Sequence, residues 1–274
     1  MPGALQLSDA RQPRYAAGSL SQGLVCAIHW GWQHRAVFNS ARRSRGGGIT
    51  PEIIGGNSGI RHWGGLSGIG WSATGTAQFI TACNQEEIGT AGTTIYCLQR
   101  HTDTTNRISS LFGVSDGGTL TRRCGSHCPS SDGSVYWDYG GATNGTTRVI
   151  WALGGKNVNR LNRWCFVAAP RGLELWFQGV LRGSTTTAAS RTTADDDRFM
   201  IGAGNVTALV NSDLSEVYLF LVWNRGLSQG EVRRLDANPW QVFATSDIQR
   251  SFVPSAASSP QVLSMLHWGG RRVG

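Results

Sequence analysis

Residues 164–179, with the sequence WCFVAAPRGLELWFQG, contain two apolar runs on either side of a Pro-Arg-Gly turn. Side chains alternate with a period of two in both runs, and aromatic residues are frequent, which is typical of β-strands. Pro170 fixes φ at one turn position and Gly172 allows a positive φ at another. The stretch predicts a β-hairpin, and we place it in the middle of a β-sandwich around which the rest of the chain wraps.

Composition favours an all-β domain. The chain has 274 residues, which is enough for one sandwich with a full core. Its 37 Gly and only 15% charged residues suit many strands joined by tight turns rather than helices. The 11 Trp exclude a disordered chain.

Further strands are expected wherever short apolar or alternating runs stand between Gly, Asn and Asp. These runs are residues 23–30, 76–83, 93–100, 107–114, 134–139, 147–153, 199–202 and 216–223. The last run, EVYLFLVW, is apolar on both faces and predicts a central strand covered on both sides. Strict alternation assigns one face to Val217, Leu219, Leu221 and Trp223, and the other to Tyr218, Phe220 and Val222.

One helix is predicted, at residues 229–236. Ser228 is an N-cap with Glu231 three residues later, which is the pattern of a capping box. The helix should end before Asn238-Pro239 because the residue before a proline disfavours the helical conformation. We expect an N-terminal arm over 1–22, the sandwich over 23–243 and an extended C-terminal arm over 244–274.

The net charge of +8 is concentrated at the ends of the chain. Six Arg against Asp9 give residues 1–50 a charge of +5, and two Arg give residues 251–274 a charge of +2. No nucleic-acid-binding motif accompanies this charge, so we expect the ends to contact an acidic protein and not nucleic acid. No apolar run approaches the roughly 18–20 residues of a membrane span, so no membrane partner is expected. The N-terminus lacks the apolar region of a signal peptide, which predicts reduced thiols.

The order of motifs resembles a known family. Residues 164–179, 198–204 and 214–235 follow the C-terminal half of a laminin-G-like, concanavalin A-like lectin-glucanase jelly roll. The resemblance extends over about residues 24–243, and its specific motifs lie in the last third. The second hairpin strand usually ends in Asp-Gly in this family, whereas this chain has Gln178-Gly179, a change that concerns a turn residue.

The residues that follow are similar to the ends of such domains in tailed-phage virion proteins: NPWQVF at 238–243 and RSFVP at 250–254. This resemblance implies a non-enzymatic virion structural protein, either a capsid decoration or head-fibre protein or a tail accessory protein. It would assemble in the host cytoplasm as a homo-oligomer that contacts other capsid or tail proteins. The alternative is a carbohydrate-binding adsorption module that recognises host-surface or environmental glycans.

Glycoside hydrolysis is the activity that some concanavalin A-like folds perform, with Glu-x-Asp-x-x-Glu on one strand. Retaining hydrolysis needs two carboxylates about 5 Å apart. Glu86 and Glu87 are adjacent and would face opposite sides of a strand, and Glu216 begins a buried strand without a partner carboxylate. We therefore expect no catalytic residues.

Two groups of residues are candidates for metal sites. Cys124, His127 and Cys128 fall one ligand short of structural zinc, unless Cys83 or Cys97 completes the set. A disulfide is one alternative, and the expectation is a Gly/Ser/Pro loop with two incidental thiols. Asp195–Asp197 offer oxygen ligands for calcium, which some laminin-G-like domains bind at the sandwich rim. Three consecutive Asp lack the alternating spacing of a calcium loop, so we expect a solvated turn and no cofactor.

Aromatic residues are the candidates for glycan stacking. Most Trp side chains in a sandwich belong to the core, but a few can lie on the surface with one ring face open to a sugar. The candidates are Trp63, Trp71, Trp137, Tyr139 and Trp268.

Overall fold

We describe a computed structural model of the chain. The residues described are 14–15, 19–30, 37–39, 53–54, 58–63, 66–71, 79–84, 88–107, 110–114, 118–194, 198–202 and 215–244.

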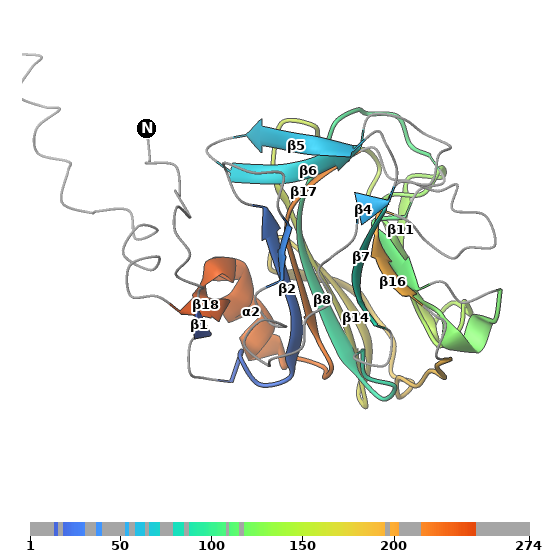
Figure 1. The fold of residues 1–274 in the computed structure, drawn as a ribbon. Helices are drawn as coiled ribbons and strands as arrows, with labels where there is room; N and C mark the ends of the chain where they lie inside the picture. The colour runs from blue at the N-terminus through green and yellow to red at the C-terminus, as the bar shows by residue number, and fades with distance from the viewer. Residues whose placement is uncertain are drawn as a thin grey trace, which may run out of the picture.

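Two antiparallel sheets face each other, as expected for a β-sandwich (Figure 1). The smaller sheet has seven strands, in the order β12-β11-β10-β9-β16-β7-β4. Their bounds are β4 Ile53–Ile54, β7 Phe79–Asn84, β9 Phe112–Val114, β10 Cys124–His127, β11 Ser134–Tyr139, β12 Arg148–Ala152 and β16 Arg198–Ile201.

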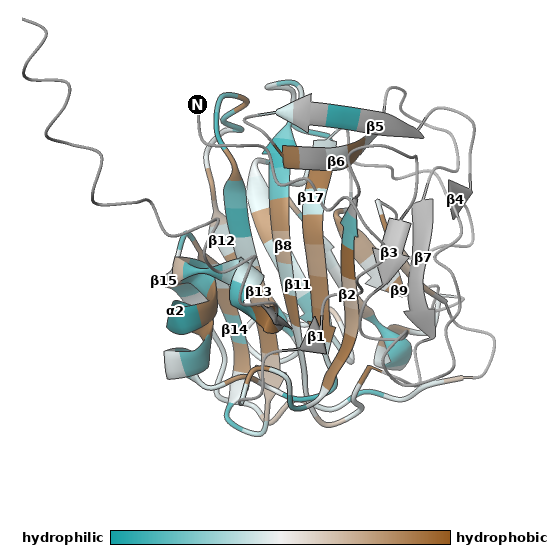
Figure 2. Ribbon diagram, turned by 60° about the vertical axis from the view of Figure 1, so that its left-hand side comes forward, coloured by the Kyte–Doolittle hydropathy of each residue, from teal (hydrophilic) through white to brown (hydrophobic). Residues whose placement is uncertain are grey.

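The larger sheet has nine strands, of which seven follow the order β15-β14-β13-β8-β17-β2-β3. Strand β6 also pairs with β17, and β5 pairs with β6. The bounds are β2 Leu24–Trp30, β3 Val37–Asn39, β5 Ser58–Trp63, β6 Leu66–Trp71, β8 Thr93–His101, β13 Asn162–Ala169, β14 Gly172–Phe177, β15 Val180–Ser184 and β17 Ser215–Trp223. Figure 2 shows that the central strands of this sheet are the most hydrophobic.

A third layer covers the outer face of the larger sheet (Figure 1). It contains helix α2, Gln229–Ala237, and a short ladder between β1, Arg14–Tyr15, and β18, Phe243–Ala244. Two 3₁₀ turns, η2 at Leu120–Arg122 and η3 at Pro239–Val242, complete the secondary structure of the described residues. Among those residues, none of the helices has the length and apolar character needed to cross a membrane.

The predicted hairpin is confirmed as β13 and β14. Trp164 lies opposite Phe177, and Ala169 lies opposite Gly172. Gly172 has φ of 116°, which is the positive value that the turn required. A second tight turn follows at Gln178 and Gly179, both with positive φ, and leads into β15, which the sequence did not predict.

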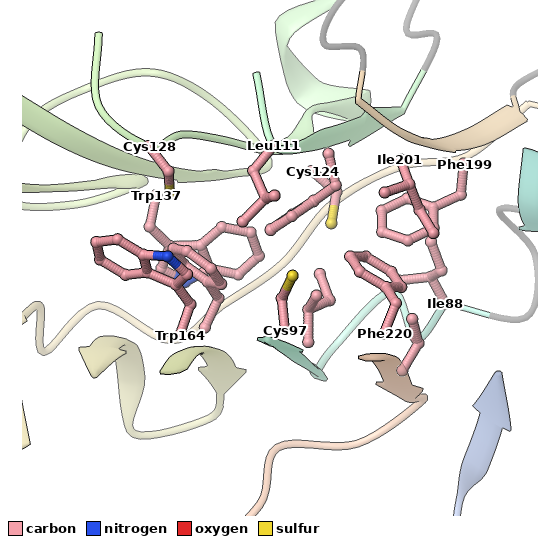
Figure 3. Close-up of a cluster of buried hydrophobic side chains, with 14 of the residues drawn as sticks. Ile88, Cys97, Leu111, Cys124, Cys128, Trp137, Trp164, Phe199, Ile201 and Phe220 are labelled. Carbon is pink, nitrogen blue, oxygen red and sulfur yellow. The ribbon is translucent and has the colours of Figure 1, made fainter. Parts of the chain in front are cut away.

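The core between the sheets is built from aromatic side chains of both (Figure 3). Phe112 of the smaller sheet is fully buried. Its ring lies 5.1 Å from the ring of Phe166 and 5.9 Å from that of Phe220, both in the larger sheet. The indole Nε1 of Trp137 also crosses the core and donates to the Val167 carbonyl at 3.1 Å. The two sheets are therefore joined by edge-to-face ring contacts and by a buried hydrogen bond.

Strand β17 is central and buried along its whole length, as predicted, but the faces predicted for Val217 and Tyr218 were wrong. Its pairing with β8 shifts between Val217 and Leu219, so that Tyr218 is an extra residue. This β-bulge reverses the alternation. The side chains that face the other sheet are Val217, Phe220 and Val222, whereas Tyr218, Leu219, Leu221 and Trp223 face the third layer.

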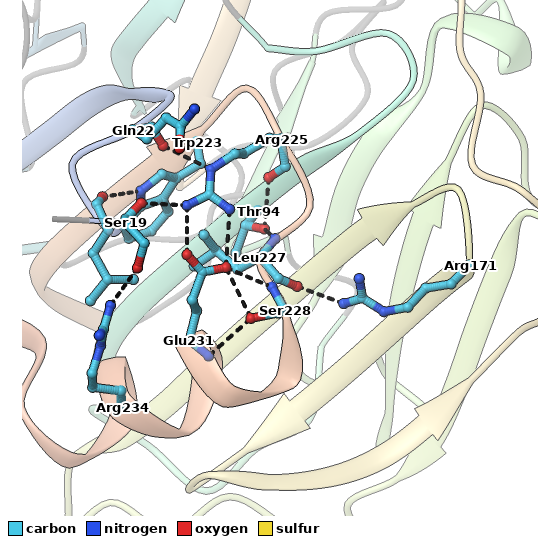
Figure 4. A network of polar contacts seen from close by, with 11 residues as sticks. Ser19, Gln22, Thr94, Arg171, Trp223, Arg225, Leu227, Ser228, Glu231 and Arg234 are labelled. Atoms are coloured by element: carbon cyan, nitrogen blue, oxygen red, sulfur yellow. Dashed lines mark hydrogen bonds and ion pairs between the residues drawn. The ribbon is translucent and has the colours of Figure 1, made fainter.

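Helix α2 begins with the predicted capping box. The Ser228 hydroxyl accepts from the Glu231 amide, and the Glu231 carboxylate accepts from the Ser228 amide. Arg225 places two N–H groups on the same carboxylate, at 3.0 and 2.8 Å (Figure 4). Arg225 also donates to the carbonyls of Ser19 and Gln22, at 2.5 and 2.8 Å. The turn before β2, which contains Ser19 and Gln22, is thereby tied to the start of the helix. This turn belongs to residues 1–22, which the sequence predicted to be an arm.

Glu231 makes this tie sensitive to pH. Hydrogen bonds from Arg225 lower the pKa of Glu231 from 4.5 to about 2. The stabilisation is complete above the ordinary pKa and is lost as the pH falls towards 2. Glu231→Gln preserves the capping pattern but removes the charge. We expect this variant to melt several degrees below the wild type at pH 7, with the difference closing as the pH falls from 5 to 2. A difference in melting temperature that is constant across this range would contradict the assignment.

Candidate functional site

The three residues considered for zinc lie on strand β10 or directly after it. The expected loop is a strand here because β9 and β11 pair with it on both sides. Alternation points Cys124 and Cys128 into the core, where both are fully buried. His127 points to the opposite face, where its Nδ1 lies 3.2 Å from the Ser110 hydroxyl. The pleat therefore separates the two thiols from the imidazole.

The thiols and the acidic residues of the described ranges do not form a metal site. Five cysteines are buried thiols: Cys26, Cys97, Cys124, Cys128 and Cys165. Within those same ranges, no three His, Cys, Asp or Glu side chains come together as metal ligands. The calcium candidates Asp195, Asp196 and Asp197 lie outside the described residues, and so does the side chain of Cys83.

The aromatic candidates have different locations. Trp137 and Tyr139 are 0% and 1% exposed, so their ring faces are covered by the core. Trp71 ends β6, but its side chain lies outside the described residues, as does Trp268. Trp63 is only partly buried, at the end of β5. Of the described aromatic candidates, Trp63 alone is not fully buried.

The β5–β6 hairpin positions Trp63 over the end of the larger sheet. Figure 1 shows this hairpin crossing one end of the sandwich. Strand β6 pairs with the start of β17, with Gly70 opposite Glu216. Gly68 allows a close approach, because a Cβ there would lie 2.8 Å from the Tyr218 ring. The hairpin therefore packs directly on the side chains of β17.

A fixed ion pair lies beside the Trp63 ring. The Cζ of Arg100 is 5.7 Å from the ring centroid of Trp63. Arg100 donates to both carboxylate oxygens of Glu216, at 2.8 and 3.0 Å. The hydroxyl of Tyr218 donates to the same carboxylate. This bidentate geometry fixes the plane of the guanidinium next to the indole.

The charge states of this group follow from its contacts. Burial raises the pKa of Glu216, but hydrogen bonds from Arg100 and Tyr218 outweigh burial and lower it below its ordinary value. Burial and the Glu216 carboxylate both raise the pKa of Tyr218. Glu216 is therefore ionised and Tyr218 is neutral at pH 7. The exposed Arg61 also lies next to Glu216. We call Arg61, Trp63, Arg100, Glu216 and Tyr218 the Trp63 cluster, and together they carry a charge of +1.

The Trp63 cluster combines a partly buried tryptophan with two guanidinium groups. Small-ligand sites are commonly built from aromatic surface and a few fixed polar groups. The sequence identified Trp63 and considered Glu216 as a lone carboxylate. It gave no signal for Arg100, which is 116 residues from Glu216 along the chain.

Comparison with known proteins supports the antiparallel β-sandwich fold. No family model and no curated protein matches the sequence. Among solved structures, the chain is similar to domain 4 of an extracellular arabinanase from Geobacillus stearothermophilus in complex with arabinotriose. The identity is 12%, the match covers 78% of this chain and 98% of that one, and the TM-score is 0.58. The chain has the fold of a jelly-roll β-sandwich.

Two further structures have the same sandwich. A Trypanosoma rangeli sialidase in complex with 2,3-difluorosialic acid is 16% identical over 81% of this chain, with a TM-score of 0.56. The receptor-binding domain of botulinum neurotoxin D is 11% identical over 81% of this chain, with a TM-score of 0.57. The match covers 34% of the sialidase chain and 54% of the neurotoxin chain. These similarities establish the fold.

Proposed function

We propose that this protein is a non-catalytic, lectin-like module that binds a glycan at the Trp63 cluster. The main observation behind this proposal is that the ring of Trp63, a partly buried residue, lies 5.7 Å from the Arg100 guanidinium, whose orientation is fixed by Glu216. The fold supports the proposal, because the arabinanase domain with this fold was solved with arabinotriose.

The aromatic ring and the two arginines of the Trp63 cluster match the apolar face and the polar edge of a sugar. The apolar C–H face of a pyranose or furanose ring packs on the open part of the Trp63 indole, which buries apolar surface. Hydroxyl oxygens at the sugar edge accept from N–H groups of Arg100 and Arg61. Because Glu216 holds Arg100 in place, little side-chain entropy is lost on binding.

A glycan array tests this proposal with three proteins. We expect the wild type to bind a subset of the glycans and Trp63→Ala to lose that binding. Leu120→Ala is the matched control, because Leu120 is 50% exposed and lies outside the cluster. Equal melting temperatures for the three proteins would show that lost binding is not lost folding. Binding by Trp63→Ala that equals the wild type would overturn the location of the site.

The virion role, capsid or tail partners and homo-oligomeric assembly remain predictions from the sequence resemblance. Mass spectrometry of virus particles purified from a host that carries the gene tests the virion role. We expect the chain to be present in these particles at a fixed copy number. Absence of the chain from such particles would contradict a structural role in the virion.

A further inference from the structure

The two sheets meet at one side of the sandwich through their edge strands, β12 and β15 (Figure 2). A Cβ on Gly183 of β15 would lie 2.7 Å from Val149 of β12, so the strands are in contact. Large hydrophobic side chains that are exposed in the described ranges are Leu120, Ile150, Val180 and Leu181. Three of the four lie on these two strands: Ile150 is 38% exposed, Val180 49% and Leu181 36%. We call this side of the molecule the β12–β15 seam.

A continuous row of aromatic and guanidinium groups runs through the seam. The Cζ of Arg182 lies 5.1 Å from the Trp151 ring, and the Cζ of Arg160 lies 5.4 Å from the Phe177 ring. The rings of Trp151 and Phe177 are themselves 5.3 Å apart. Stacking on these rings restricts both guanidiniums, so less entropy is lost when they bind a carboxylate.

Neither seam arginine is neutralised within the described part of the chain. Arg160 and Arg182 are exposed, and no carboxylate of the described residues pairs with them. Other arginines are paired, including Arg100 with Glu216 and Arg163 with Asp236. The seam therefore presents two oriented positive charges beside an apolar surface.

We infer that the β12–β15 seam is a docking surface for a second protein that carries carboxylates around an apolar centre. Trp and Arg contribute most strongly to binding at protein interfaces, and here Trp151 and Arg182 lie on the same two strands as three exposed aliphatic side chains. Carboxylates of the partner would pair with Arg160 and Arg182. This function is separate from glycan binding at the Trp63 cluster and does not depend on it.

Charge argues against an occupant from the same chain. Two copies joined through this seam would bring four unpaired guanidiniums together, which is unfavourable. Residues 245–274 contain three Arg and one Asp, so they carry a charge of +2, and residues 1–13 contain one Arg and one Asp. Neither segment supplies an excess of carboxylates.

The local structure favours contact through side chains of a protein. Arg182 is an extra residue in the pairing of β15 with β14, and such a bulge with a charged side chain hinders the addition of another strand. An acidic polysaccharide would pair with the arginines but would gain little from the aliphatic side chains of Ile150, Val180 and Leu181. These three aliphatic side chains therefore favour a protein partner over an acidic glycan.

A displayed library of random 12-residue peptides is the probe for this inference. We expect selection on the wild type to enrich sequences in which Asp or Glu flank aliphatic residues. A synthetic peptide with the enriched sequence should bind at least tenfold more weakly to Arg160→Ala/Arg182→Ala and to Val180→Ser/Leu181→Ser. Arg234→Ala is the matched control, because the exposed Arg234 donates to the Ser19 hydroxyl beside the turn before β2 and its loss changes the charge in the same direction. The control and Trp63→Ala should bind the peptide as the wild type does.

Four results would overturn the inference. One is enrichment of peptides without acidic residues, and a second is equal binding by the seam variants and the wild type. Another is heparin binding that depends on Arg160 and Arg182 but is unchanged in Val180→Ser/Leu181→Ser, which would indicate an acidic polysaccharide. The last is a wild-type dimer in light scattering that becomes a monomer in the seam variants, which would make the seam a contact between copies.

Discussion

Replacing Phe112 with alanine should destabilise the protein by about 3–5 kcal/mol, the usual range for a buried Phe→Ala change. Phe112 is fully buried and contacts the rings of Trp137, Phe166, Phe199 and Phe220. Two of these rings belong to each sheet, so the cavity would open at the junction of the sheets. Urea unfolding followed by Trp fluorescence measures the change in the free energy of unfolding.

Leu120→Ala is the control for this measurement. Its side chain is 50% exposed and creates no cavity, so we expect a change within about 0.5 kcal/mol of zero. A loss below about 1 kcal/mol for Phe112→Ala would contradict the close packing of the two sheets around this ring.

Replacing Gly172 with alanine should cost ~3 kcal/mol, because strain at a special backbone conformation and a steric clash add. Its φ is 116°, and a Cβ would lie 2.1 Å from the Thr185 carbonyl oxygen. Thr185 cannot easily retreat, because its amide donates to the Leu173 carbonyl and its hydroxyl accepts from the Leu173 amide, both at 2.9 Å. The free energy of unfolding in urea is again the measured quantity.

Gly230→Ala, unlike Gly172→Ala, should increase the free energy of unfolding. Gly230 is inside helix α2, and no atom lies within 4 Å of a Cβ added there. Because alanine favours the helix over glycine, the variant should gain about 0.5–1 kcal/mol. If both glycine variants changed stability by the same amount and sign, the backbone conformation assigned to the hairpin turn would be wrong.

Features that depend on nearby residues could be predicted from the sequence. The β13–β14 hairpin needs only alternation and a Pro-Arg-Gly turn within 16 residues, and the start of α2 needs only Ser228 and Glu231. Strand β11 was predicted with its observed bounds, Ser134–Tyr139, for the same reason. In each case the local preference and the final fold agree.

Features set by distant neighbours could not be predicted. The sequence of β10, CGSH, has little intrinsic strand preference, and it is a strand because β9 and β11 pair with it. The bulge at Tyr218 is an irregularity of the pairing with β8, so an alternating pattern cannot show it. Arg100 and Glu216 meet only because β8 and β17 are neighbours, which places the polar part of the candidate site beyond local patterns.

Calorimetric titration with a glycan selected on the array tests the central claim most directly. We expect Trp63→Ala to bind at least tenfold more weakly than the wild type, a loss of about 1.4 kcal/mol that is within the range for burial of a large apolar side chain. Trp63→Phe should retain most of the affinity, because phenylalanine keeps an aromatic face beside Arg100. Failure of the wild type to bind any glycan, or equal affinities for Trp63→Ala and the wild type, would contradict glycan binding at the Trp63 cluster.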